Sequence, residues 1–310
     1  MFIPLFEGAG GGNRNITKSD KMKKLIISCF IIAVASFTQA QEAAEVKKVV
    51  YPTGFSEQLN VVYTKVGDWE GKMDLYLPSK EKGPSPIVIN IHGGGFNKGN
   101  KESQTGFNSF FKNGYAVANI AYRLVQVAPA PAAVEDTRCA LIYLIKNAKA
   151  LNIDPNRIVI MGGSAGGHLA LMGGLLGNDT KFDGNCPGVK DVKVAAIIDK
   201  YGITHLGNWA SRSATWWLGD KAKDQKFIES VSPLFQVKKT SPPVFIVHGD
   251  ADPIVAYQQS VDLKKKLDEF GVKNKFMTIE GGEHGKFPKD KNSELNAAII
   301  DFLKELGIHK

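Results

Sequence analysis

Ser164 combines a nucleophilic side chain with a local pattern suited to covalent chemistry. It lies within residues 162–166, whose sequence matches G-x-S-x-G. An apolar stretch at 158–161 precedes this motif, and a helical pattern over 165–176, expected to be amphipathic, follows it. A tight turn between a strand and a helix would present the hydroxyl at the helix N-terminus, where free N–H groups stabilise a developing negative charge. The pattern therefore predicts a nucleophilic serine.

A glycine-rich loop could supply hydrogen-bond donors for that negative charge. His92 and the three glycines at 93–95 directly follow the apolar stretch 87–91. Consecutive glycines let the backbone approach a ligand closely, and with the N–H of Ala165 the loop could form an oxyanion hole. The alternative, a phosphate-binding loop, lacks the Lys-Ser/Thr pair of a P-loop. We expect His92 to fix the loop, and include it among the candidate substrate-binding residues.

A general base and an orienting acid are found farther along the chain. His284 lies in the glycine-rich segment 281–285, directly after the apolar stretch 275–279. Two acids, Asp250 and Asp252, come earlier, after another apolar stretch. The order serine, aspartate, histidine is the one expected for a nucleophile on a parallel α/β sheet. His284 would take the serine proton and later return it, while one of the acids would hold the required imidazole tautomer.

None of the other histidines lies in a comparable loop. Two lie at strand ends ahead of the wrong loops, one lies within a helical pattern, one in a non-periodic segment and one near the C-terminus. In that order they are His92, His248, His168, His205 and His309. His205 could line a substrate pocket, although a solvated loop position is the alternative. His284 is therefore the predicted base.

The hydrophobic pattern indicates the elements that would position these residues. Residues 72–77 alternate polar and apolar, which is typical of an edge or antiparallel strand. Short continuous apolar runs indicate parallel strands covered on both faces, and longer helical patterns separate them. The expected strands are 87–91, 116–120, 158–161, 194–198, 244–247 and 275–279, and the expected helices are 132–151, 165–176, 256–270 and 293–306. This alternation predicts one α/β domain, residues 41–310, with a mostly parallel sheet flanked by helices.

Residues 203–242 interrupt the alternation and contain three of the four tryptophans, Trp209, Trp216 and Trp217. A long insert on the side where loops follow strands could cap a pocket. Trp216 and Trp217 are therefore candidate substrate-binding residues. The alternative is that the insert uses its tryptophans to pack onto the sheet.

The first 40 residues resemble an export signal with an upstream extension. Residues 22–40 contain two lysines, an apolar run of eleven residues and a small-residue cleavage site ending at Ala40. The run is too short to span a bilayer, so we expect no stable membrane span and an exported, periplasmic or extracellular protein. Residues 1–21 would reflect a start codon assigned too early. A lipoprotein cleavage box ending at Cys29 is the alternative.

The net charge of the chain argues against a nucleic-acid-binding protein. The formal net charge is +8, of which the first 40 residues contribute +3. The mild surplus on the remaining 270 residues does not favour nucleic acid as a partner.

Removal of the signal would leave Cys139 and Cys186, which could form a disulfide in an exported protein or remain two buried thiols. Neither has the spacing of a metal site.

Four motifs in this order resemble the α/β-hydrolase superfamily, and within it the small esterase and lipase branch with an HGGG oxyanion loop. They are the loop 92–95, the turn 162–167, the acid loop that starts at His248, and the segment around His284. The resemblance extends from about Asp74 to Leu306, and the Asp-Pro-Asn-Arg at 154–157 is also typical of the branch. One departure is Ala256, where the branch usually has a proline.

The branch includes hormone-sensitive-lipase-like carboxylesterases and bacterial feruloyl- or acetyl-esterase-like enzymes. In it, the acid lies four residues after the histidine of His-Gly-x-x-Asp, which selects Asp252 and leaves Asp250 as the fallback. The sites that the resemblance implies are a triad of Ser164, Asp252 and His284 and oxyanion donors at Gly94, Gly95 and Ala165.

These observations predict an exported serine carboxylesterase that needs no metal or cofactor. Its substrates would be short-chain acyl esters of small molecules or saccharides, such as acetyl or feruloyl esters. One alternative is a peptidase of the prolyl-oligopeptidase type, which usually needs a propeller domain larger than the segment before Asp74 can supply. Another is a non-catalytic binding protein, although such relatives commonly lack the serine or the histidine.

Overall fold

The computed structural model describes residues 48–186 and 188–310, which belong to one compact unit. The predicted upstream extension, the predicted export signal and Cys29 lie outside the described residues. No helix in the described part of the chain is long and apolar enough to cross a membrane.

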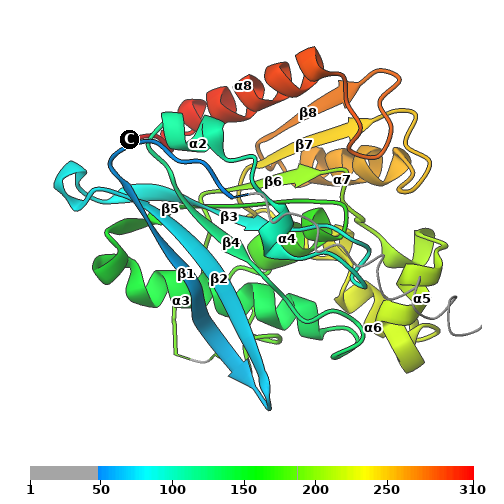
Figure 1. Cartoon of the computed structure of the whole chain (residues 1–310). Helices are drawn as coiled ribbons and strands as arrows, with labels where there is room; N and C mark the ends of the chain where they lie inside the picture. The colour runs from blue at the N-terminus through cyan, green and yellow to red at the C-terminus, as the bar shows by residue number, and fades with distance from the viewer. Residues whose placement is uncertain (1–47, 187) are drawn as a thin grey trace, which may run out of the picture. The chain divides into compact units, whose positions relative to one another are not determined.

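Eight strands form one sheet in the order β1-β2-β4-β3-β5-β6-β7-β8 (Figure 1). The strands are β1 (Phe55–Val66), β2 (Trp69–Pro78), β3 (Ser85–Ile91), β4 (Ala116–Ile120), β5 (Ile153–Gly163), β6 (Ala196–Lys200), β7 (Val244–Gly249) and β8 (Asn274–Ile279). β2 is antiparallel to β1 and to β4, whereas all the pairings among β3 to β8 are parallel. The predicted α/β fold with a mostly parallel sheet is confirmed.

Helices cover both faces of this sheet. They are α2 (Asn108–Lys112), α3 (Ala132–Leu151), α4 (Ala165–Leu175), α5 (Arg212–Leu218), α6 (Gln225–Ser230), α7 (Gln258–Glu269) and α8 (Lys289–Glu305). α3, α4 and α7 pack on one face, and α2 and α8 pack on the other (Figure 1).

Burial on both faces explains the continuous apolar runs. In β3, the side chains of Ile87 and Ile89 belong to the core beneath α3 and α4, while that of Val88 belongs to the core beneath α2 and α8. α4 differs from the expected amphipathic helix, because every one of its residues is buried. A helix enclosed on all sides carries no polar face.

Some element boundaries differ from those expected. The sequence pattern did not predict β1, an edge strand in which most residues are exposed or half-buried and which shows no clean alternation. β6 begins at Ala196 rather than at residue 194. α8 begins four residues early, at Lys289, because its charged first turn adds no apolar periodicity.

The insert 203–242 folds into α5, α6 and short 3-10 turns, which lie together at one end of the sheet (Figure 1). Trp217 is fully buried and its ring stacks on that of Phe96 with 4.2 Å between centroids. Trp209 is also buried, and its indole N–H donates to the carbonyl of Ile254. Trp216 is 53% exposed. Two of the three tryptophans thus pack the insert onto the domain.

Cys139 of α3 forms a disulfide with Cys186, so the first of the two alternatives for these cysteines is the one observed. The neighbouring Arg138 forms a buried ion pair with Asp183, with 2.7 Å between Nη2 and Oδ2. Both links hold the segment between α4 and β6 against α3.

Candidate active site

Ser164 occupies a strained turn between β5 and α4. Its backbone has φ 58° and ψ −123°, a conformation that residues other than glycine rarely adopt. A Cβ atom on Gly162 would lie 2.2 Å from the carbonyl oxygen of Gly166, and one on Gly166 would lie 2.2 Å from that of Ile91. The two flanking glycines are therefore required by the close approach of the helix to the strands, as the motif predicted.

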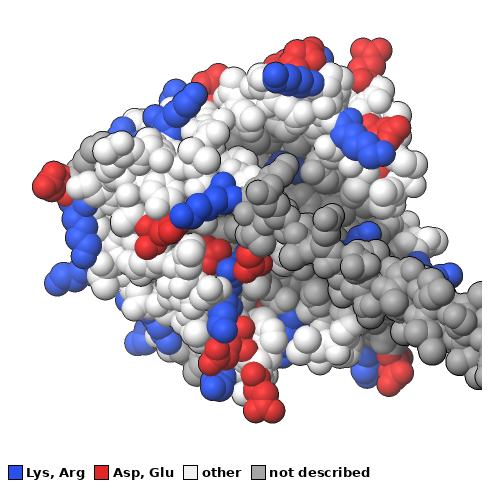
Figure 2. All heavy atoms as spheres, viewed as in Figure 1, with Lys and Arg blue, Asp and Glu red and all other residues white. Residues whose placement is uncertain are grey.

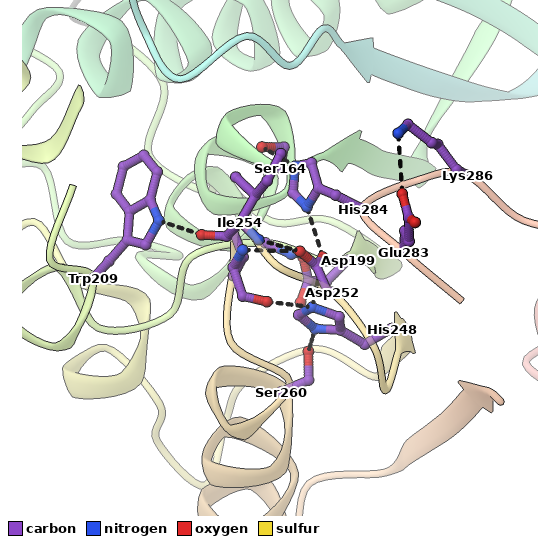
Figure 3. Close-up of polar contacts among 12 residues, drawn as sticks. Ser164, Asp199, Trp209, His248, Asp252, Ile254, Ser260, Glu283, His284 and Lys286 are labelled. Carbon is purple, nitrogen blue, oxygen red and sulfur yellow. Dashed lines mark hydrogen bonds and ion pairs between the residues drawn. The ribbon is translucent and has the colours of Figure 1, made fainter. Parts of the chain in front are cut away.

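Ser164 is linked through His284 to Asp252 (Figure 3). The distance from Oγ of Ser164 to Nε2 of His284 is 2.8 Å, and Nδ1 of His284 lies 2.6 Å from Oδ2 of Asp252. Burial raises the pKa of Asp252, but hydrogen bonds from His248, His284 and two backbone N–H groups outweigh it and hold the pKa well below its usual range. The ionised carboxylate can only accept, so Nδ1 carries the proton and Nε2 is free to accept the serine proton.

Sheet topology brings these three residues together. Ser164 follows β5, Asp252 follows β7 and His284 follows β8. The carboxyl ends of parallel strands lie along the same edge of a sheet, which is where open α/β sheets place their ligand sites. Asp250, the fallback acid, makes no hydrogen bond to the imidazole of His284 among the described residues; its Oδ1 instead accepts the N–H of Gly281 at 2.7 Å.

His248 is a member of this network that the sequence reasoning missed. Its Nε2 lies 3.1 Å from Oδ2 of Asp252 and 3.0 Å from the carbonyl oxygen of Val255, and its Nδ1 lies 2.7 Å from Oγ of Ser260 (Figure 3). Both partners of Nε2 can only accept, so Nε2 carries the proton and Nδ1 accepts from Ser260. Asp252 therefore receives an N–H from an imidazole on each side. The His-Gly-x-x-Asp motif, which places His248 four residues before Asp252, was the sequence feature that could have indicated this contact.

The predicted oxyanion donors lie around the nucleophile. Gly94 and Gly95 line the same cavity as Ser164, and Ala165 is the first residue of α4. In the described part of the chain, their three N–H groups have no hydrogen-bond acceptor. The N–H groups of Asn97 and Lys98 close the loop by donating to the carbonyl of Gly94. A Cβ atom on Gly94 would lie 2.0 Å from the carbonyl oxygen of Lys98, so this tight loop requires glycine.

A cavity of about 540 Å³ opens beside Ser164 and His284. Trp209 and Ser213 of the insert, Ile254 of the acid loop and Tyr201 contribute to its wall. Asn97 donates to Oγ of Ser213 at 2.9 Å and so joins the glycine loop to the insert.

Three candidate substrate-binding residues do not line this cavity. His92 is buried, its Nδ1 lies 2.8 Å from the carbonyl oxygen of Gly93, and its ring stacks on that of Tyr122. Trp217 is enclosed against Phe96, and Trp216 is 53% exposed and is not part of the cavity wall. The cavity wall therefore does not support His92 or Trp217 as substrate-binding residues, and a role for Trp216 stays a prediction.

Two related outcomes concern the insert. His205 does not line the cavity, since its ring packs on that of Phe235. Trp209, which was not singled out as a binding residue, is the tryptophan that lines the cavity.

Charged side chains of both signs are interspersed over the face shown in Figure 2. A single-sign field of the kind that attracts nucleic acid is absent from the described part of that face. Within the described residues, no group of three or more His, Cys, Asp or Glu side chains has an arrangement that could hold a metal ion.

Known proteins with similar sequences include esterases. The chain is 25% identical over 228 residues to "Esterase LipC" of Mycobacterium tuberculosis, covering 67% of this chain and 54% of the relative. It is 25% identical over 283 residues to "Isoprenylcysteine alpha-carbonyl methylesterase ICME" of Arabidopsis thaliana, covering 84% and 63%. The chain thus spans about half to two thirds of the length of these relatives.

Solved structures with the same fold include a "Truncated form of carbohydrate esterase from gut microbiota", at 28% identity and a TM-score of 0.74. The match covers 84% of this chain and 99% of that one. An "acetyl ester-xyloside bifunctional hydrolase from Caldicellulosiruptor lactoaceticus" has a TM-score of 0.71 at 22% identity, covers 85% and 100%, and shows the fold alone. A family model, BD-FAE, matches residues 73–267. The chain therefore belongs to the BD-FAE family and has the α/β-hydrolase fold.

Proposed function

We propose that this protein is a serine carboxylesterase with Ser164 as its nucleophile. The observation that carries the proposal is the unbroken series of hydrogen bonds from Ser164 through His284 to an ionised Asp252, at 2.8 and 2.6 Å. This series opens into a cavity that also holds free N–H donors. The named esterases among the relatives support the same reaction class.

The residues suffice for acyl transfer in two steps. As Oγ of Ser164 attacks the acyl carbon, Nε2 of His284 takes its proton, and Asp252 stabilises the imidazolium. The N–H groups of Gly94, Gly95 and Ala165 are the proposed donors to the tetrahedral oxyanion. His284 returns the proton to the departing alcohol, which leaves an acyl-enzyme. A water molecule then gives a proton to Nε2 of His284 as it attacks the acyl carbon. His284 passes that proton to Oγ of Ser164 as the acyl–oxygen bond breaks, which releases the acid and restores the serine. No step requires a metal or a cofactor.

The proposed substrates are short acyl esters, such as acetyl or feruloyl esters of saccharides. Three observations support this narrower statement. The cavity is of moderate size, at about 540 Å³, and one of its walls is the aromatic ring of Trp209. In addition, a solved structure that matches most of this chain is titled a carbohydrate esterase.

We also propose that the protein is exported. The segment 22–40 has the three-part pattern of a signal peptide. The disulfide between Cys139 and Cys186 is of the kind that persists in oxidising compartments.

Hydrolysis of p-nitrophenyl acetate, butyrate and octanoate, measured beside the Ser164→Ala variant, tests the proposal. We expect serine-dependent turnover that falls as the acyl chain lengthens, and we expect release of acid from acetylated oligosaccharides or methyl ferulate. Folded protein that hydrolyses none of these esters would overturn the proposal. Cleavage of a prolyl peptide by such a protein would instead favour a peptidase.

A further inference from the structure

The cavity beside the nucleophile is lined by two lysines and by no acid. Lys98 and Lys200 are both part of its wall, whereas no Asp or Glu of residues 48–186 and 188–310 lines it. Asp252 lies behind His284, with its side chain fully enclosed. The wall therefore offers basic side chains to the substrate and no carboxylate.

Lys200 lies one strand away from the nucleophile. It is the last residue of β6, it pairs in register with Gly163, and its carbonyl accepts the N–H of Ser164 at 2.9 Å. The preceding Asp199 directs its side chain toward Gly167 of α4, and its Oδ1 accepts the N–H of Gly202. Because successive strand residues point to opposite faces, Lys200 faces away from Asp199 and contributes to the cavity wall together with Asn90.

The ammonium group of Lys200 has neither a hydrogen bond nor an ion pair among the described residues. Burial lowers its pKa from the ordinary value. Lys101 shows how this fold treats a buried lysine that serves the structure, since its Nζ lies 2.8 Å from both carboxylate oxygens of Asp74. Half-buried cations are normally paired in this way. An unpaired one in a substrate cavity is complementary to an anion that the ligand brings.

We propose that Lys200 is a specificity-determining residue that binds a carboxylate group of the substrate. The preferred substrates are then esters that carry a carboxylate on the acyl or the alcohol part, such as acidic saccharides or half-esters of diacids. This inference rests on the proposed carboxylesterase function. Lys98, an exposed residue at the mouth of the same wall, adds long-range attraction.

Two matched pairs of esters test the inference, each pair differing in a single charge. On the acyl side, monoethyl succinate is compared with ethyl succinamate, and on the alcohol side 4-acetoxybenzoate is compared with 4-acetoxybenzamide. A charge-assisted hydrogen bond to an ammonium should favour the anionic ester by on the order of tenfold in kcat/KM in at least one pair. The preference should arise mainly in KM and should decrease as salt is added.

Substitution of the lysine identifies its role. Lys200→Met and Lys200→Gln should both reduce the ratio of kcat/KM for the anionic over the neutral ester to about one, and Lys200→Arg should retain much of it. Lys265→Met, at an exposed position on α7, is the control and should leave the ratio unchanged. Labelling of Ser164 by a fluorophosphonate reports that each variant is folded.

These experiments distinguish failure of the proposed carboxylesterase function from failure of the proposed role of Lys200. If the unmodified protein hydrolyses neither member of either pair and none of the p-nitrophenyl esters, the proposed function itself is wrong. Hydrolysis of anionic and neutral esters at equal rates would overturn only the role of Lys200. A preference for the anionic ester that persists in labelled, folded Lys200→Met and Lys200→Gln would do the same.

Discussion

Replacing Asp252 by asparagine should leave His284 in place but prevent it from acting as a base. Oδ2 of Asp252 accepts from His284 at 2.6 Å and from His248 at 3.1 Å, and Oδ1 accepts the N–H groups of Ile254 and Val255 at 2.8 and 3.0 Å. An asparagine can keep its single oxygen toward the two backbone donors. Its NH₂ group would then face the two imidazoles, which at present donate to that position.

The tautomer of His284 changes as a consequence. Its Nδ1 must become an acceptor for the amide, so the proton moves to Nε2, the atom that faces Ser164. A protonated Nε2 cannot take the serine proton. The expected loss is on the order of 10⁴-fold in kcat, which corresponds to about 5 kcal/mol of transition-state stabilisation.

The assay is the steady-state hydrolysis of p-nitrophenyl acetate, with Asp250→Asn as the matched control. The carboxylate of Asp250 accepts the N–H of Gly281, and an amide oxygen can do the same. The control should therefore stay within about threefold of the unmodified protein, the range of a small hydrogen-bond change. An Asp252→Asn variant within tenfold of normal, or a larger loss in Asp250→Asn, would show that Asp252 does not set the tautomer of His284.

Three further predictions concern packing, the disulfide and pH. Trp217→Ala should lower the free energy of unfolding, measured by urea titration, by about 3–5 kcal/mol and should change the acyl preference little. Trp209→Ala should instead change the ratio of acetate to butyrate hydrolysis. The reverse pattern would show that Trp217, and not Trp209, contacts the substrate. Replacing Cys139 and Cys186 by alanine opens a loop with a sequence separation of 47 and should cost roughly 4 kcal/mol of stability, and an unchanged melting temperature would show that the bond adds no stability. Burial raises the pKa of Asp199 from 3.8 to about 7, so the native state binds this proton more tightly than the unfolded chain and stability is lost as the pH rises from about 4 to 7. The stability of Asp199→Asn relative to the unmodified protein should therefore increase between pH 5 and pH 8, by on the order of 2 kcal/mol, and a pH-independent difference would be inconsistent with a buried, titrating Asp199.

Much of the fold could be predicted because its central strands are covered on both faces. Such strands must be apolar along their whole length, so β3, β4 and β7 were recognisable as short continuous runs. β1 has no such signal, since it is an edge strand with much of its surface in solvent. Edge strands are specified by pairing with a neighbour, which a local pattern does not reveal.

The central site residues were predictable for a different reason. Ser164 and the glycines beside it are required by a local turn, so their spacing carries the information. The contact between His248 and Asp252 instead depends on how the acid loop folds back over the end of β7. The pairing of Cys139 with Cys186 likewise depends on tertiary placement.

The tryptophans of the insert show the limit of reasoning from residue type. Trp216 and Trp217 are adjacent on α5, and adjacent helical residues point about 100° apart, so the two rings face different surroundings. One is buried against Phe96 and the other is exposed. Trp209 is a tryptophan of the same insert, so residue type alone does not distinguish it from the other two. Its position at the end of a 3-10 turn is what brings it to the cavity.

The central claim is that Ser164 carries the acyl group during turnover. Brief incubation with p-nitrophenyl acetate, followed by acid quenching, digestion and peptide mass spectrometry, tests it directly. We expect one acetyl group on the peptide that contains Ser164, and no such adduct in the Ser164→Ala variant, which should also have lost its turnover. Steady hydrolysis with Ser164 unmodified, and with equal rates in the Ser164→Ala variant, would show that Ser164 is not the nucleophile.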